Sequence, residues 1–597
     1  MPSRIEDYAL IGDGLTAALV GMDGSVDWLC LPRFDSPACF AALLGSADNG
    51  RWQIAPATAT TATTRRYRGD SLILETEFTT ATGKVRLIDF MPPREIAPDL
   101  VRIVEGVEGR VDLHMELIFR FDYGSVVPWV TRSDDGLKAI AGPDLVRLAT
   151  AVPLTGEHFT TQSNFAVEAG QRVPFVMTWY PSCEPEPEPV DAEAAVHQTA
   201  EFWAEWVAKC NYDGPNRDAV IRSLITLKSL TYRPTGGMVA APTTSLPEEL
   251  GGVRNWDYRY CWVRDSTFTL FSLANAGYLD EARAWRTWLR RAIAGTPETL
   301  QIMYGIDGQR RLPEMELPWL AGYEGAKPVR VGNAAAQQFQ LDVYGELSGT
   351  MYECLRAGLE ETIDGWNIAL SLHSALETLW REPDEGIWEV RGPRRHFTHS
   401  KIMAWVAFDR VIKVIEEFGM EGPLDRWRAI RDEIHAEVCR EGYNTSKGAF
   451  VQFYGSDQLD ASLLLITTVG FLPASDPRVQ GTIEAIEREL TDESGLVERY
   501  SPQTDVDGLP PGEGKFLPCS FWLANNLKAL GRLDDATRLL DRLLGLTNNV
   551  GLLSEEYDPK AQRMTGNFPQ AFSHLALIHT VFTLNNHCPP AHGGVQY

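Results

Sequence analysis

The chain has 597 residues and a formal net charge of −26, with 44% hydrophobic and 10% aromatic residues. This length exceeds what one hydrophobic core usually serves, so we expect two or three domains. Such an acidic chain is a poor match for nucleic acid, which is bound by clustered Lys and Arg, and anionic membranes repel it. A neutral small molecule or a sugar is the better ligand class.

The N-terminus and the cysteines indicate a reduced, cytoplasmic protein. MPSRIEDYALIGDG lacks a basic segment followed by an apolar run, so we expect no secretory signal. No apolar stretch reaches about 18 residues, so no membrane span is expected. The cysteines form no CxxC pair, which predicts free thiols rather than a disulfide frame or a zinc site. They stand at positions 30, 39, 183, 210, 261, 354, 439, 519 and 588.

Residues 1–190 carry the pattern of an antiparallel β-sandwich domain. TAALVGMDGSVDWLCLP predicts two apolar strands around a turn, and SLILETEFTTATGKVRLIDFMPP predicts a second pair. LVRIVEG, VDLHMELIFRF and VPFVMTWYP continue the series, and strands at this spacing are typical of sandwiches. The alternating Pro and Glu of CEPEPEPVDAEAA predict a stiff, solvated linker. With the helix predicted in HQTAEFWAEWVAKC, this linker region covers residues 191–212.

From residue 213 to residue 597 the apolar spacing is helical and predicts twelve helices. Their starts are expected near Asp218, Ser266, Leu279, Ala334, Ile363, Lys401, Leu424, Ala461, Asp476, Phe516, Leu533 and Phe568. Short connections alternate with six long ones, at about 235–263, 294–332, 383–397, 442–458, 491–515 and 550–567. If six hairpins close into a ring, all long loops gather on one face. We therefore predict an (α/α)6 toroid with a loop-built cleft as the catalytic domain. An open α-solenoid is the alternative, which the unequal loops disfavour.

Four of the long loops mix aromatic rings, carboxylates and arginines. A sugar needs this mixture, because its C–H faces stack on aromatic rings and its hydroxyls bond to charged groups. Hydrolysis of a glycoside also needs two carboxyl groups. Each feature has a plainer explanation: Trp256 and Trp262 as core, Arg264 and Asp265 as a helix-capping ion pair, and the acidic residues as solvated loops. The residues alone do not choose among the carboxylates.

Several motifs, in this order, resemble glycoside hydrolase family 15, the glucoamylase and bacterial trehalase group. The resemblance covers nearly the full length. GSVDWLCLPRFDSP is similar to the start of bacterial members, which carry a β-sandwich before the toroid. DYRYCWVRD resembles the first substrate-binding motif of the family, and GIWEVRG resembles its general-acid loop. FLPCSFWL and SEEYD are similar to its late motifs.

The resemblance implies roles for individual residues. Glu389 takes the general-acid position and Glu555 the general-base position. The residues implied to hold the non-reducing glucose are Arg264 and Asp265, with the aromatic Tyr258 and Trp262. Further cleft residues are expected to be Trp319, Tyr323, Arg330, Trp388, Glu556 and Tyr557. Trp388 is expected to help desolvate the acid, while Glu556 stands where glucoamylases often have Gln.

These roles predict an inverting exo-acting α-glucoside hydrolase. An acid and a base about 6.5–9.5 Å apart leave room for the attacking water. We expect glucose release from α-gluco-oligosaccharides first, and from trehalose or α-1,6-linked isomaltose-type substrates as alternatives. A disaccharide phosphorylase and a non-catalytic sugar-binding protein are the rival classes. No metal and no organic cofactor is expected, since no His/Asp cluster has ligand spacing; oligomeric state is not predicted.

Overall fold

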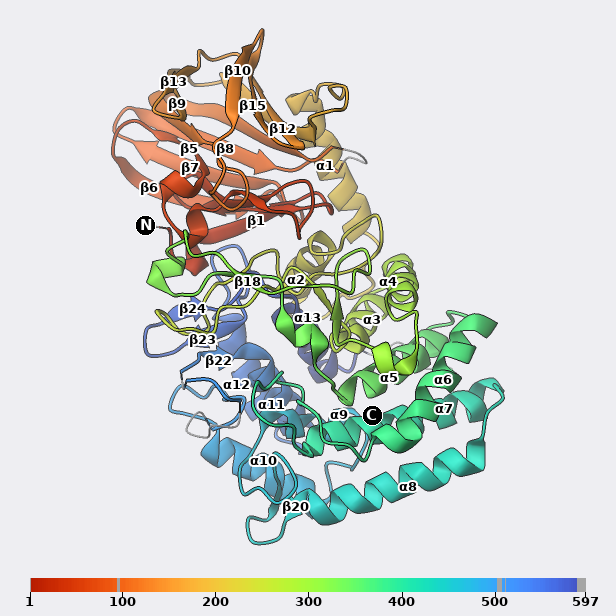
Figure 1. Ribbon diagram of the computed structural model, residues 1–597. Coiled ribbons are helices and arrows are strands. Elements are labelled where there is room, and N and C mark those ends of the chain that lie inside the picture. The colour runs from red at the N-terminus through yellow and green to blue at the C-terminus, as the bar shows by residue number, and fades with distance from the viewer. Residues whose placement is uncertain (1, 94–96, 502–506, 511, 588–597) are drawn as a thin grey trace.

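The N-terminal domain is built from antiparallel strands. The computed structural model describes residues 2–93, 97–501, 507–510 and 512–587. Fifteen strands of this domain are joined to one another by hydrogen bonds, and every pair among them is antiparallel (Figure 1). They are β1 (Tyr8–Gly12), β2 (Ala17–Gly21), β3 (Ser25–Cys30), β4 (Ala38–Phe40), β5 (Arg51–Pro56), β6 (Thr60–Tyr67), β7 (Leu74–Thr80), β8 (Gly83–Phe90), β9 (Asp99–Ile118), β10 (Trp129–Ser133), β11 (Gly136–Ala141), β12 (Asp144–Thr150), β13 (Thr155–Glu157), β14 (Thr160–Glu168) and β15 (Arg172–Pro181).

The long strand β9 belongs to both layers of this domain. Its first half pairs with β8 and β15, and its second half pairs with β5 and β14. The two stretches LVRIVEG and VDLHMELIFRF thus form one strand. The change of partners falls at Gly106 and Gly109. A Cβ at Gly106 would lie 2.1 Å from the Glu168 carbonyl oxygen, and Gly109 has a φ of +63°. Glycine is required here because the strand bends closely past its neighbours.

Twelve helices follow the linker helix α1 (Ala192–Val207) in the described part of the chain. They are α2 (Arg217–Ser229), α3 (Ser266–Asn275), α4 (Leu279–Ala292), α5 (Asp342–Arg356), α6 (Ile363–Leu379), α7 (Thr398–Phe418), α8 (Leu424–Glu441), α9 (Leu465–Thr468, extended by a 3-10 turn over Ala461–Leu464), α10 (Pro477–Glu489), α11 (Leu517–Ala529), α12 (Leu533–Leu544) and α13 (Ala571–Leu584). None of the described helices is both long and apolar enough to cross a bilayer.

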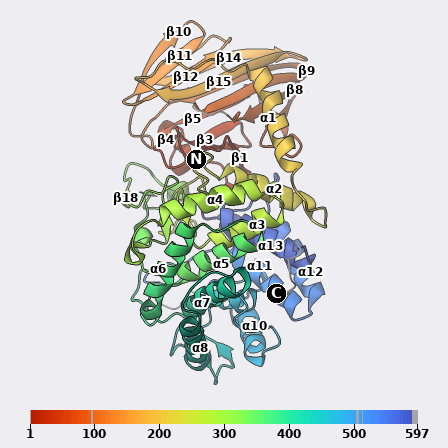
Figure 2. The same cartoon turned by 90° about the vertical axis from the view of Figure 1, so that its right-hand side faces the viewer.

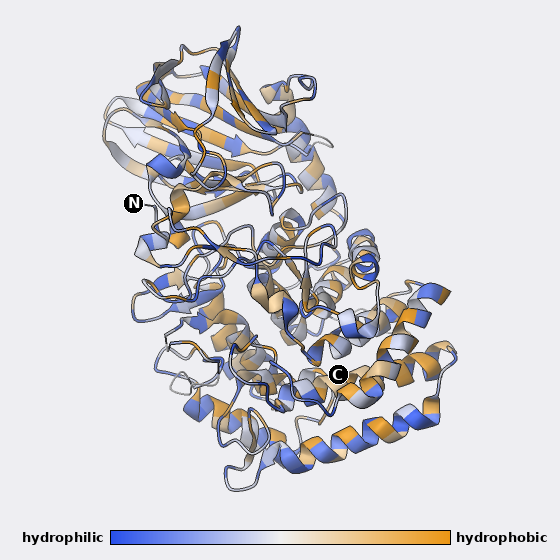
Figure 3. Cartoon of the chain, viewed as in Figure 1, coloured by the Kyte–Doolittle hydropathy of each residue, from blue (hydrophilic) through white to orange (hydrophobic). Residues whose placement is uncertain are grey.

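Alternate helices close into an inner ring. Contacts run from α3 to α5, α7, the turn before α9, α11, α13 and back to α3. The helices between them pack outside, as Figures 1 and 2 show below the β-domain. Burial follows this division: α11 is buried from Leu517 to Leu527, whereas α12 buries only Ala536, Leu540 and Leu543. Outer helices such as α8 are amphipathic, with polar and apolar residues side by side in Figure 3. The predicted toroid is confirmed.

One helix begins later than its apolar pattern predicted. The residues near Ala334 form a single 3-10 turn (Ala334–Gln337), and α5 begins only at Asp342. The intervening backbone donates its N–H groups to side chains of the third long loop. Phe339 N–H bonds to Glu385 Oε2 at 2.9 Å, and Leu341 N–H bonds to Asp384 Oδ2 at 3.0 Å. These bonds hold the segment extended.

Polar contacts join the β-domain to the loops of the toroid. Trp28 Nε1 donates to the Pro242 carbonyl oxygen at 2.8 Å, and Arg65 Nε donates to Asn549 at 2.9 Å. Short strands of the helical domain lie within its loops: β16 (Cys261–Trp262), β17 (Met303–Tyr304), β18 (Met315–Glu316), β19 (Arg330–Val331), β20 (Tyr443–Asn444), β21 (Ala449–Phe450), β22 (Lys515–Phe516), β23 (Glu556–Asp558) and β24 (Arg563–Thr565). The described cysteines are all free, and Cys183 is exposed; Cys588 lies outside the described residues.

Candidate active site

A polar cleft lies where the inner helices begin. Its lining residues come from the segments before α3, α5, α7, α11 and α13. They are Glu248, Arg254, Trp256, Tyr258, Arg264, Asn333, Ala335, Ile387, Trp388, Glu389, Arg391, Arg499, Tyr500, Asp507, Leu509, Phe516 and Gln570. Loops that are far apart in sequence thus meet on one face, as a closed ring of hairpins requires.

Glu389 reaches this cleft from the loop before α7. Its side chain keeps 19% exposure, and its backbone has a φ of +58°, a left-handed conformation that costs a non-glycine residue about 1–2 kcal/mol. Oε1 accepts hydrogen bonds from Trp262 Nε1 at 2.7 Å and from Arg264 Nη1 at 3.4 Å. Burial raises the pKa of Glu389, while Arg264 and the Trp262 N–H oppose that rise. A carboxyl with a raised pKa is suited to donate a proton.

Glu555 is fully buried beside β23. Oε1 accepts from the Tyr258 hydroxyl at 2.6 Å, and Oε2 accepts from Asn567 N–H at 3.1 Å. Gly566 makes room for it, since a Cβ there would lie 2.5 Å from Glu555 Oε2. Burial, and to a smaller extent the negative charge of Glu248, raise the pKa of Glu555 to about 8. The hydrogen bonds from Tyr258 and Asn567 act in the opposite direction and lower this pKa.

Two aromatic rings connect the two carboxyls. Tyr258 contacts Glu555 and Trp262 contacts Glu389, and the two rings meet edge to face with centroids 5.2 Å apart. Glu389 and Glu555 are therefore linked through one aromatic pair. Fixed placement of two carboxyls in this way is what acid–base hydrolysis of a glycoside needs.

An ion pair lies next to Glu389. Arg264 Nε donates to Asp265 Oδ1 at 3.0 Å, and the guanidinium lies 5.1 Å from the centre of the Phe572 ring. The side chains of Arg264 and Asp265 are 13% and 5% exposed. Arg264 also donates to the Ile387 carbonyl oxygen at 3.3 Å. These bonds fix the guanidinium at the cleft wall, where it can bind sugar hydroxyls.

Comparisons with known proteins agree with this geometry. The model described as "Glycosyl hydrolases family 15" matches residues 214–582, and "Trehalase-like, N-terminal" matches residues 1–179. The chain belongs to glycosyl hydrolases family 15. It is similar to "Trehalase" of Mycobacterium tuberculosis (40% identity; 97% of this chain and 89% of that protein) and "Trehalase" of Thermoplasma volcanium (35%; 96% and 92%). A bacterial glucoamylase complexed with acarbose shares the fold, with a TM-score of 0.72, 12% identity, and coverage of 98% and 94%. The chain is therefore a glycoside hydrolase, and its substrate is a carbohydrate.

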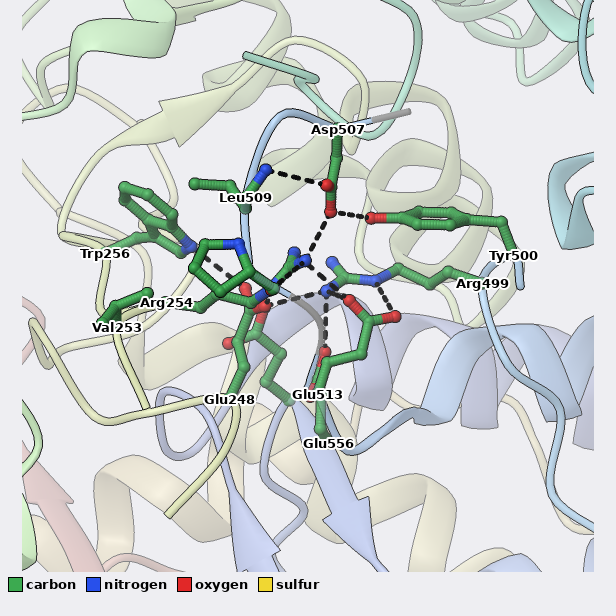
Figure 4. A network of polar contacts seen from close by, with 12 residues as sticks. Glu248, Val253, Arg254, Trp256, Arg499, Tyr500, Asp507, Leu509, Glu513 and Glu556 are labelled. Atoms are coloured by element: carbon green, nitrogen blue, oxygen red, sulfur yellow. Dashed lines mark hydrogen bonds and ion pairs between the residues drawn. The ribbon is translucent and has the colours of Figure 1, made fainter. Parts of the chain in front are cut away.

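Figure 4 shows a buried network of charges in this family 15 hydrolase. Two of its members, Glu248 and Glu556, lie close to Glu555. Arg499 Nη2 lies 2.9 Å from Glu248, 2.7 Å from Glu513 and 3.1 Å from Glu556. Arg254 contacts Asp507, whose Oδ2 also accepts from the Tyr500 hydroxyl at 2.7 Å. Trp256 Nε1 donates to Glu248 at 3.1 Å. The fifth long loop is thereby tied to the first.

Seven residues expected to bind sugar lie outside the lining of the cleft, and so does Glu555. Two of the seven, Trp262 and Asp265, bond to the lining residues Glu389 and Arg264. The second long loop turns toward the β-domain. Trp319 Nε1 donates to the Tyr123 carbonyl oxygen at 3.0 Å, and the Tyr323 hydroxyl donates to the Ser3 carbonyl oxygen at 3.1 Å. Arg330 donates to the Val253 and Asn255 carbonyl oxygens. Glu556 and Tyr557 belong to β23, and Glu556 is fully buried.

Trp388 does line the cleft, and its Nε1 donates to Asp460 at 2.9 Å. The ionisable lining residues that the sequence analysis did not predict are Glu248, Arg254, Arg391, Arg499, Tyr500 and Asp507. Most of them fall in the first and fifth long loops. The run Glu498-Arg499-Tyr500 carried the same mixture of carboxylate, arginine and aromatic ring as the other loops, and this was the available signal.

One cluster of three carboxyl groups has a spacing that a cation could bridge. Among the described residues, oxygens of Glu248, Glu555 and Glu556 lie within 4.8 Å of one another. The positive charge that the structure supplies there is the Arg499 guanidinium, in contact with Glu248 and Glu556.

Proposed function

We propose that this chain is a trehalase that hydrolyses α,α-trehalose to two glucose molecules. The observation that carries the proposal is the full-length similarity to proteins named trehalase, across both the β-domain and the toroid. The similarity to glucoamylase supports only the fold. Trehalose, placed second to α-gluco-oligosaccharides by the sequence motifs, is therefore the preferred substrate.

In the proposed mechanism Glu389 is the acid. It protonates the glycosidic oxygen, and the C1–O bond of the first glucose breaks to release the second glucose as a neutral alcohol. Burial favours its protonated form, which is the form that donates the proton. The bound first glucose contacts Arg264 and Asp265, whose hydrogen-bonded pair presents both a donor and an acceptor.

Glu555 is the proposed base. Above its pKa of about 8, Glu555 is ionised and takes a proton from a water on the opposite face of the first glucose, and the water oxygen attacks C1. The bonds from Tyr258 and Asn567 stabilise the ionised form. The attack inverts C1, so the first glucose leaves as the β-anomer. The second glucose keeps its own α-configuration, because no bond to its anomeric carbon breaks.

The second glucose lies on the other side of the scissile oxygen. We propose that it contacts Arg391, Trp256 and Asp507, which line the same cleft as Glu389. Arg391 is anchored by Glu314 at 2.9 Å, and its guanidinium lies 4.3 Å from the Trp256 ring centre. Arg391→Ala should raise KM for trehalose and leave α-glucosyl fluoride kinetics unchanged, because the fluoride has no second sugar.

The deciding experiment is hydrolysis of trehalose, maltose and isomaltose at equal concentrations, followed by NMR of fresh product. We expect trehalose to have the highest kcat/KM and to give α- and β-glucose in equal initial amounts. A preference for maltose would refute the substrate, and α-glucose alone would refute inversion. Phosphate-dependent formation of a sugar phosphate would instead identify a phosphorylase.

A further inference from the structure

The carboxyl of Glu556 lies in an unusual electrostatic position. It is fully buried, directly follows Glu555, and lies within 4.8 Å of Glu248 and Glu555. Figure 4 shows it below the Arg499 guanidinium, which also contacts Glu248 and Glu513. Several carboxyl groups thus share a small buried volume.

The hydrogen bonds are distributed unequally among these carboxyls. Both oxygens of Glu555 accept a bond, from Tyr258 and Asn567. Both oxygens of Glu248 also accept one, from Trp256 at 3.1 Å and Arg499 at 2.9 Å. Neither oxygen of Glu556 accepts a hydrogen bond, although Arg499 Nη2 is 3.1 Å from Oε1. Hydrogen bonds stabilise an ionised carboxylate, so Glu556 is the member least able to carry the charge.

The number of positive and negative charges in the network also indicates that one of its carboxyls is protonated. The network contains the guanidiniums of Arg254 and Arg499, and they already contact Glu248, Glu513 and Asp507. Two positive charges therefore face three carboxylates before Glu555 and Glu556 are counted. Buried like charges at this spacing do not all ionise, and one carboxyl keeps its proton.

We infer that Glu556 remains protonated near neutral pH and acts as a positioning residue, whose neutral carboxyl allows the adjacent Glu555 to be ionised as the base. Burial raises the pKa of Glu556 well above its usual range; Arg499 opposes this, and Glu248 and Glu513 add to it. The charged or titratable groups facing Glu556 are Arg499, Glu248, Glu513, Glu555 and, from α11, Cys519. The inference rests on the proposed role of Glu555.

Infrared difference spectroscopy of the full-length protein tests the protonation state. Glu556→Gln has the shape and charge of a neutral Glu556, so the wild-type minus variant spectrum at pH 7 should show one lost carboxylic-acid C=O band. Glu513→Gln is the matched control, because Glu513 pairs with the same arginine at 2.7 Å. Its difference spectrum should show a lost carboxylate band instead. Loss of a carboxylate band in Glu556→Gln would overturn the inference.

Thermal unfolding gives a second test that does not depend on activity. If Arg499 does not need a charge at position 556, Glu556→Gln should unfold at the wild-type temperature, and Glu513→Gln should unfold earlier. Failure of Glu556→Gln to fold would itself show that the charge is required, and would overturn the inference.

The pH dependence of kcat/KM tests whether the charge at position 556 affects the ionisation of Glu555. Glu248→Gln removes a negative charge next to Glu555, so the acidic limb should move to lower pH by about one unit. Glu556→Gln replaces a group that is already neutral, so its acidic limb should stay in place. An equal downward shift in both variants would contradict the inference. Complete loss of activity in Glu555→Gln is a separate result that tests the base, while the spectra and the unfolding curves report on Glu556 alone.

Discussion

Replacing Tyr258 with Phe removes a single hydrogen bond to the proposed base. The Tyr258 hydroxyl donates to Glu555 Oε1 at 2.6 Å. A hydrogen bond to a charged group contributes about 1.5–3 kcal/mol. One pKa unit corresponds to about 1.4 kcal/mol, so the pKa of Glu555 should rise by about one to two units in Tyr258→Phe.

The direction of the pH effect follows from the role of the base. The bond favours ionised Glu555 and lowers its pKa, against the burial that raises it. Without the bond, Glu555 takes up its proton at a higher pH, and the acidic limb of kcat/KM moves up by about one to two units. At a pH below both limbs, the variant should be about 10- to 100-fold slower than the wild type, and this difference should shrink as the pH rises.

The assay is glucose release from trehalose between about pH 5 and pH 10. Tyr500→Phe is the matched control, since Tyr500 also lines the cleft but donates to Asp507. Its acidic limb should stay where the wild-type limb lies. A uniform loss of activity in Tyr258→Phe, with no shift of the limb, would show that Tyr258 only packs against Trp262 and would refute the reasoning.

Three further predictions concern the acid, the ion pair and stability. Glu389→Gln should nearly abolish trehalose hydrolysis but spare α-glucosyl fluoride, which needs little acid help, whereas Glu555→Gln should impair both; equal loss on both substrates in Glu389→Gln would contradict the acid role. Arg264→Ala should raise the pKa of Glu389, because Arg264 now lowers it, and should move the alkaline limb of kcat/KM to higher pH, as a pH titration would show. Asp89→Ala breaks the fully buried pair with Arg102 and should cost about 3–5 kcal/mol in urea unfolding, while Glu433→Ala, at the exposed pair with Arg381, should cost under about 1 kcal/mol.

The periodicity of apolar residues was enough to predict the architecture. Strand alternation and turn residues identified the β-domain, and helical spacing with alternating loop lengths identified the closed ring. These features are local, since each depends on residues a few positions apart. The later start of α5 was not predictable in this way, because side chains of Asp384 and Glu385, from a different loop, bind the backbone before it.

The motifs were also enough to predict the main candidate residues. Tyr258, Arg264, Trp388 and Glu389 do line one cleft, and Glu555 bonds to Tyr258. Trp319 and Tyr323 carried the same mixture of residue types, but their loop packs on the β-domain instead. Composition of a loop cannot distinguish these cases, since the direction of a loop depends on its distant neighbours.

The sequence by itself determined which elements form, and its motifs resembled those of a glycoside hydrolase. Only the tertiary structure decided which charges share one buried volume. Glu248, Glu513 and Glu556 are separated by up to about 300 positions, yet all contact Arg499. Their protonation depends on the distances between them and on the exclusion of water, and both exist only after the ring of helices has closed.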